Sequence, residues 1–121
     1  MVAVAKTSEP KPDFASNGRA IDVEHLARMT LGERSLEREV LALFDRQADM
    51  LLPRIRRGDP AVAAASAHTL KGSAVGIGAF GVARAAEAVE RAEDAAFAAA
   101  IETLAAVLEE TKAEIARLLA N

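Results

Sequence analysis

The 121-residue chain contains no cysteine, tryptophan or tyrosine, and only 3% of its residues are aromatic. Without cysteine there can be neither a disulfide framework nor a thiolate metal site, which fits a reducing compartment. We therefore expect a cytoplasmic protein. Strand-forming aromatic residues are scarce, whereas alanine, the strongest helix former, recurs throughout the chain, so the composition favours an all-α fold.

An excess of positive charge is missing as well. The 18 acidic and 15 basic side chains give a net charge of -3, so no overall positive field would attract nucleic acid. No stretch approaches the roughly 20 apolar residues needed to cross a bilayer, and the apolar opening Met1 to Ala5 is too short for a signal-peptide core. We expect a soluble, monomeric, single-domain protein, because this length supports one hydrophobic core and no second long apolar stripe is evident.

Turn-forming residues divide the chain into a tail and a domain. Residues 6–19 mix proline, serine and glycine with no apolar period, so residues 1–20 are predicted to be a flexible tail and residues 21–121 a domain. A short helix should follow Asp22 and end near Gly32. A long amphipathic helix is expected from about 33 to 57, bent or loosened by Pro53, with a buried stripe of Leu36, Val40, Leu43, Phe44, Leu51 and Ile55.

Three further helices are predicted. Gly58-Asp59-Pro60 can close one helix and start the next, which should end near Gly76 and Gly78. Local signals alone allow one helix over 79–120, but it would be about 60 Å long, so a turn near Glu93 with Asp94 as N-cap is expected. The last helix has a seam of Ile101, Leu104, Leu108, Thr111, Ile115 and Leu118. The predicted fold is an antiparallel four-helix bundle with a short additional N-terminal helix.

One histidine on the third helix is predicted to face solvent. At 100° per residue, the core-facing residues point together, and His68 points roughly 160° away from them. Those core residues are Ala63, Ser66, Leu70, Ala74 and Ile77. The face around His68 carries one charge, Lys71, and otherwise small or apolar residues, which is typical of a surface that a partner approaches: Ala61, Ala64, Ala65, Gly72 and Val75.

Two neighbours of His68 suit phosphate chemistry. Lys71 lies three residues further on the helix, where its ammonium could offset the charge of a phosphoryl group. Gly72 lies one turn after His68 and leaves no side chain to block the imidazole, although glycine inside a helix costs about 1 kcal/mol relative to alanine. Taken separately, Lys71 could be a solubilising charge, and Gly72 could allow two helices to pack closely.

The run Ala67-His68-Thr69-Leu70-Lys71-Gly72-Ser73-Ala74, followed by Ile77-Gly78-Ala79, resembles the signature of histidine phosphotransfer (HPt) domains. The resemblance covers about residues 21 to 119, and Val89-Glu90 lies where the family often has an apolar residue followed by glutamate. Gly76 departs from the pattern, since many members have asparagine there. The resemblance implies that His68 is the phosphorylated residue and that Lys71 and Gly72 support it.

The implied function is transfer of a phosphoryl group between His68 and receiver-domain aspartates in a multistep His-Asp phosphorelay. Response regulators and a hybrid histidine kinase are the implied partners. No cofactor is expected on this chain, because a receiver domain brings its own Mg²⁺. The chain has no phosphate-binding Gly-x-x-x-x-Gly-Lys-Ser/Thr motif, so we expect a phosphocarrier and not an enzyme.

Two other functions remain open at this point. The bundle could be a phosphotransfer-inactive module that only binds a partner, or an enzyme with His68 as general base, which the lack of an evident second catalytic group disfavours. His25 is interpreted as a surface or packing residue, and Arg54, Arg56 and Arg57 as complements of a helix dipole. Glu109, Glu110 and Glu114 are interpreted as a solvated face, and no bound metal is expected.

Overall fold

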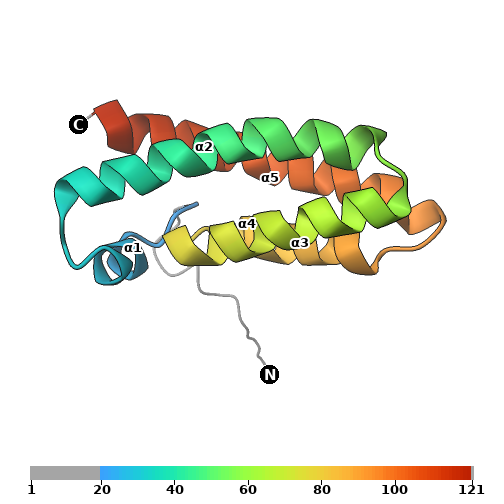
Figure 1. The fold of residues 1–121 in the computed structure, drawn as a ribbon, viewed down its shortest axis with the longest axis horizontal. Coiled ribbons are helices and arrows are strands. Elements are labelled where there is room, and N and C mark those ends of the chain that lie inside the picture. The colour runs from blue at the N-terminus through green and yellow to red at the C-terminus, as the bar shows by residue number, and fades with distance from the viewer. Residues whose placement is uncertain (1–19, 121) are drawn as a thin grey trace, which may run out of the picture.

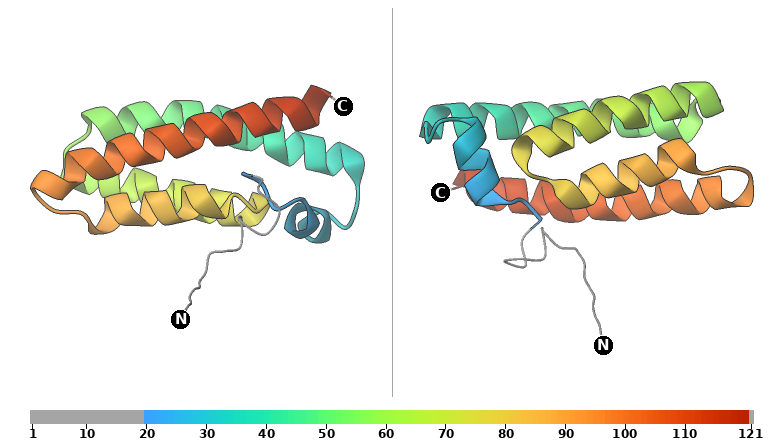
Figure 2. Two further views of the ribbon diagram at one scale, coloured as in Figure 1. Left: turned by 180° about the vertical axis from the view of Figure 1, so that it is seen from behind. Right: turned by 90° about the horizontal axis from the view of Figure 1, so that it is seen from below.

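The computed structural model describes residues 20–120, so the predicted tail lies outside the described residues except for Ala20. This part contains five helices and no strand: α1 (Val23–Met29), α2 (Arg34–Arg57), α3 (Pro60–Ile77), α4 (Phe80–Arg91) and α5 (Ala95–Ala120). The four longer helices form an antiparallel bundle, and α1 lies across one end of it (Figures 1 and 2). The predicted fold class is confirmed.

Local capping signals explain where the first helices begin. The Asp22 side chain accepts a hydrogen bond from the His25 backbone N–H at 3.1 Å, as an N-cap should. At the next boundary Asp59 caps α3 by accepting from the Val62 N–H at 2.9 Å, and Pro60 occupies the first helical position. These starts were predicted correctly because each depends on residues within one helical turn.

Helix α2 is continuous through Pro53, but its buried face differs from the predicted stripe. The buried residues are Leu41, Phe44, Ala48, Leu51 and Ile55. Leu36 and Leu43 were predicted to be buried and are instead 36% and 57% exposed. Leu43 precedes Phe44 by one residue, so its side chain leaves the helix about 100° away from the core direction.

The last two turns differ in how they reverse the chain. Gly78 ends α3 with a φ of 81°, a left-handed conformation that glycine adopts without strain. The predicted break near Glu93 is confirmed, since α4 ends at Arg91 and α5 starts at Ala95. Asp94 contributes a left-handed backbone with φ 53°, and the Phe97 N–H bonds to its carbonyl, so the break is made by the main chain and not by the expected side-chain cap.

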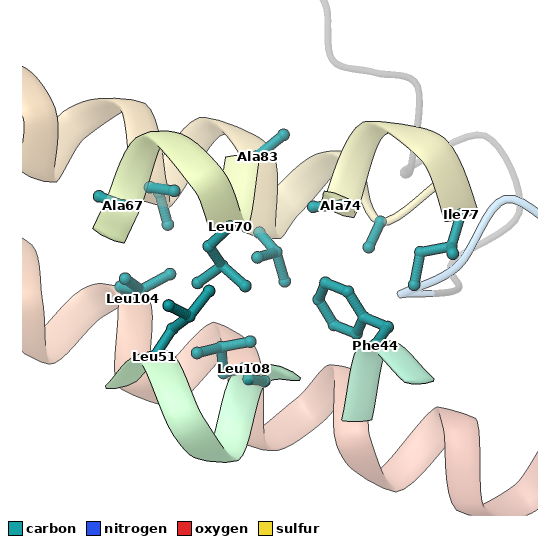
Figure 3. Packing of buried hydrophobic residues seen from close by; sticks show 14 of the residues in the cluster. Phe44, Leu51, Ala67, Leu70, Ala74, Ile77, Ala83, Leu104 and Leu108 are labelled. Atoms are coloured by element: carbon teal, nitrogen blue, oxygen red, sulfur yellow. The ribbon is translucent and has the colours of Figure 1, made fainter. Parts of the chain in front are cut away.

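The core lies between the four long helices. Phe44 and Leu51 from α2, Leu70 from α3, and Leu104 and Leu108 from α5 point toward one another (Figure 3). Alanines complete the core on the α3–α4 side, where small side chains let the two helix backbones approach: Ala67, Ala74, Ala83 and Ala86. The opposite side of α3 therefore stays at the surface.

No helix within residues 20–120 combines the length and the apolar character required to span a bilayer.

Candidate functional site

The exposed side of α3 carries His68. The five residues predicted to face the core are all buried, whereas the His68 side chain is 70% exposed. The orientation predicted from helical periodicity is therefore confirmed. An imidazole this accessible can meet a reactive group on a second protein without any change in the bundle.

Helix α4 brings a carboxylate to this imidazole. Val89 is buried in the core, and the next residue, Glu90, lies about 100° further around α4, on the side of α3. Its Oε2 atom is 2.8 Å from Nδ1 of His68. The two side chains are 22 residues apart in sequence and meet because α3 and α4 are antiparallel neighbours.

Lys71 completes a group of three charged or polar side chains. Its Nζ atom lies 3.3 Å from Oε1 of Glu90. This buried oxygen accepts no well-directed hydrogen bond, so its contact with Lys71 is an ion pair. Burial by itself would raise the pKa of Glu90, but the hydrogen bond from His68 and the nearby Lys71 ammonium outweigh it and lower that pKa below its usual value. Glu90 is therefore ionised at neutral pH.

The ionised carboxylate decides which imidazole nitrogen can react. A carboxylate only accepts hydrogen bonds, so Nδ1 of His68 must carry a hydrogen and donate it. In a neutral ring, Nε2 then keeps its lone pair. Nε2 makes no hydrogen bond to any residue between 20 and 120, so it is free to act as a nucleophile.

Lys71 and Gly72 lie where the sequence predicted them, next to His68. The Lys71 ammonium faces Glu90 in this structure, so it reaches the imidazole through the shared carboxylate. A Cβ built on Gly72 would meet nothing within 4 Å. The interpretation that Gly72 allows close helix packing is thus wrong.

The predicted docking residues surround the imidazole. Ala61, Ala65 and Val75 are exposed and Ala64 is half-buried. Val75 is one of the exposed larger apolar side chains of the described chain, at 43%. These four residues are thus at least partly accessible, and their contact with a partner stays a prediction.

The structure bears on the interpretation of three single residues. The sequence suggested Glu90 only as part of a residue pair and no evident second catalytic group near His68, whereas the structure places the Glu90 carboxylate 2.8 Å from Nδ1 of His68. Glu114 was assigned to a solvated face, but it is 5% exposed and hydrogen-bonded to Arg117. The packing role that was one of the two interpretations of His25 is confirmed, because its ring contacts Phe80 and hydrogen-bonds the Val75 carbonyl.

A local pattern could not have placed Glu90 beside His68, because this contact depends on how α3 and α4 are aligned. The pair of buried Val89 and charged Glu90 is the only local signal, since it places a carboxylate at the edge of a buried stripe. Among residues 20–120, no cluster of three or more histidine, aspartate or glutamate side chains could hold a metal ion.

Comparison with known proteins agrees with this geometry. The sequence model of the Hpt domain family matches residues 39–120, which is more than half of the chain. The crystal structure of histidine phosphotransferase ShpA from Caulobacter crescentus matches the structure of this chain with a TM-score of 0.66, and the two sequences are 30% identical. That match covers 81% of this chain and 88% of ShpA. Comparison with curated protein sequences gave no match. An exposed histidine on a four-helix bundle thus occurs in a sequence that matches the Hpt model, and we conclude that this chain belongs to the Hpt domain family of histidine phosphotransfer proteins.

Proposed function

We propose that His68 accepts a phosphoryl group and exchanges it with the aspartate of a receiver domain in a multistep His-Asp phosphorelay. Family membership supports histidine phosphotransfer as the activity. The chain has two histidines, and the Nε2 atom of His25 is engaged by the Val75 carbonyl. His68 is the one with an exposed ring and a free Nε2, and this observation carries the proposal.

The transfer step follows from the tautomer. The Nε2 lone pair of His68 attacks the phosphorus of an aspartyl phosphate, the N–P bond forms, and the P–O bond to the aspartate breaks as its carboxylate leaves. Because Nδ1 keeps its hydrogen, the ring gains a positive charge during attack. The Glu90 carboxylate at 2.8 Å stabilises that charge, and the same steps in reverse return the group to an aspartate.

Lys71 and Gly72 are proposed to assist in different ways. The Lys71 ammonium lies beside the Glu90 carboxylate and can offset the negative charge of a phosphoryl group brought to His68. Gly72 keeps the surface low one turn from the imidazole, so that a receiver can bring its aspartate close. We further propose that Ala61, Ala64, Ala65 and Val75 contact the partner.

The protein acts as a phosphocarrier in this proposal. The phosphoryl group comes from a phosphorylated receiver or a hybrid histidine kinase, so the chain itself needs no nucleotide. Any Mg²⁺ required for transfer is proposed to belong to the receiver domain, whose acidic pocket holds the aspartate. The chain's own contribution is an accessible nucleophile with a fixed tautomer.

The test is transfer from radiolabelled phospho-receivers of the same genome to the purified protein. We expect a label on the protein that is labile in acid and stable in alkali, that is lost in His68→Gln, and that persists in His25→Gln. Label that survives His68→Gln would contradict the assigned site. Absence of transfer to and from every receiver and kinase of that genome would favour a bundle that only binds its partner.

A further inference from the structure

We propose that His25 is a positioning residue for partner docking: it fixes α1 against the exposed end of α3, where α1 forms part of the surface that meets the receiver domain. The inference rests on the proposed phosphate exchange at His68. It assigns a role to the second histidine of the chain and extends the docking surface beyond the residues around the imidazole.

His25 connects α1 to the end of α3 through its side chain. Its Nε2 atom is 2.9 Å from the Val75 carbonyl oxygen, and since a carbonyl only accepts, Nε2 is the donor. The ring also packs edge-on against Phe80, the first residue of α4, with ring centroids 5.1 Å apart. One side chain therefore holds α1 to both helices that flank the α3–α4 turn.

The start of α1 is anchored to the same turn. The Asp22 N–H donates to the Gly78 carbonyl at 2.9 Å, and the Asp22 side chain accepts from the His25 N–H. A Cβ on Gly78 would lie 2.8 Å from the Asp22 carbonyl oxygen, which shows how closely the two segments approach. The beginning of α1 is thus fixed by the main chain, and further along the helix the buried Leu26 and the side chain of His25 hold it against the bundle.

The size of a protein interface places α1 within reach of a partner centred on His68. Val75 follows His68 by two helical turns on the same exposed face, about 10 Å away. A standard interface covers about 800 Å² on each partner, which corresponds to a disc with a radius of about 16 Å. Such a disc extends past Val75 onto α1.

Exposed apolar side chains are concentrated on the same helices. Within residues 20–120, every large apolar side chain that is exposed belongs to the segment from α1 to α3: Met29, Leu31, Leu36, Leu43, Met50, Val62 and Val75. Leu31 is 88% exposed and has a φ of 56°, a conformation unfavourable for leucine. Helices α4 and α5 have none, and Met29, Leu31 and Val75 of this set lie on α1, directly after it and at the end of α3 that His25 contacts.

The proposal predicts a separation of binding from chemistry. Loss of the His25 contacts would let α1 move with Met29 and Leu31 while the His68–Glu90 pair stays intact, because that pair involves α3 and α4 only. Binding of the receiver should weaken, and the reactivity of the imidazole should not change.

The experiment compares three variants of the full chain. His25→Phe keeps the aromatic contact without the donor, His25→Gln keeps a donor without the ring, and His25→Ala removes both. Transfer rates are measured against the concentration of acetyl-phosphate-charged receiver domains from the same genome. We expect the half-saturating receiver concentration to rise about fivefold in His25→Ala and His25→Phe, with partial rescue in His25→Gln and an unchanged maximal rate.

Phosphoramidate, a small phosphoryl donor that needs no docking surface, provides the second measurement. It should label His68 at the wild-type rate in all three variants. Lys112→Met, which removes an ion pair between α5 and α2, serves as a matched control for lost stability. The proposal is overturned if His25→Ala raises the half-saturating concentration no more than Lys112→Met, or if phosphoramidate labelling falls equally. If the wild-type protein accepts phosphate from no receiver, the function proposed for His68 fails first and this inference fails with it.

Discussion

At the scale of single residues, the contact between His68 and Glu90 connects the fold to the chemistry. Glu90→Gln should slow phosphoryl transfer to His68 about tenfold to a hundredfold, because a neutral amide bonds Nδ1 more weakly and cannot stabilise the positive ring. Single-turnover transfer at saturating receiver measures the effect. Glu87→Gln is the matched control, since Glu87 lies one turn earlier on α4 and pairs with Arg91. Equal rates in both variants would exclude the electrostatic role of Glu90.

Gly72 gives a residue-scale prediction in which stability and function change in opposite directions. Its position is helical and open, so Gly72→Ala should raise the free energy of unfolding by about 0.5–1 kcal/mol. The added methyl group stands one turn from His68, so transfer from a receiver should slow while phosphoramidate labelling stays the same. Urea denaturation and the two labelling assays check these outcomes. A variant that transfers as fast as the wild-type protein would contradict the steric explanation for this glycine.

At the scale of helices and turns, replacing Gly78 by alanine should have the opposite effect on stability to replacing Gly72. Its left-handed φ and the nearby Asp22 carbonyl leave no room for a side chain. Gly78→Ala should therefore lower the free energy of unfolding by about 1–3 kcal/mol. Denaturation of this variant beside Gly72→Ala compares the same chemical change in two backbone settings. Similar stabilities for the two would refute the assigned strain.

The helices also show which features a sequence can predict. The starts of α1 and α3 were predictable because Asp22 and Asp59 cap the helices that directly follow them. The exposure of Leu43 was not predictable, because periodicity counts apolar residues on a face and does not locate the neighbouring helices. The position of Glu90 beside His68 was missed for the same reason, since it depends on the alignment of two helices across the bundle.

At the scale of the whole molecule, Lys112 connects the C-terminal helix to α2. Its Nζ atom lies 2.5 Å from Asp45 and 2.9 Å from Asp49. Burial acts to lower the pKa of Lys112, but the two carboxylates outweigh it and raise that pKa above 10.5. The contribution of this contact to stability is therefore fully present below about pH 10.5 and is lost as the pH rises through the raised folded-state pKa.

Thermal unfolding between pH 8 and pH 12 tests this prediction at the level of the bundle. The wild-type protein should lose more stability than Lys112→Met above pH 10.5, and the two curves should converge at the alkaline end. A constant difference across the whole range would mean that the ammonium of Lys112 does not contribute through its charge.

The concentration of exposed apolar side chains on α1 to α3, the segment that carries His68, also determines the order of events in the proposed relay. In the relay proposed above, a phosphoryl donor and an acceptor both dock around His68, so they cannot be bound together. The carrier has to release the first before it engages the second, which gives ping-pong kinetics and competition between the two proteins. The flux of signal through such a relay then depends on the relative amounts of the proteins that share this face.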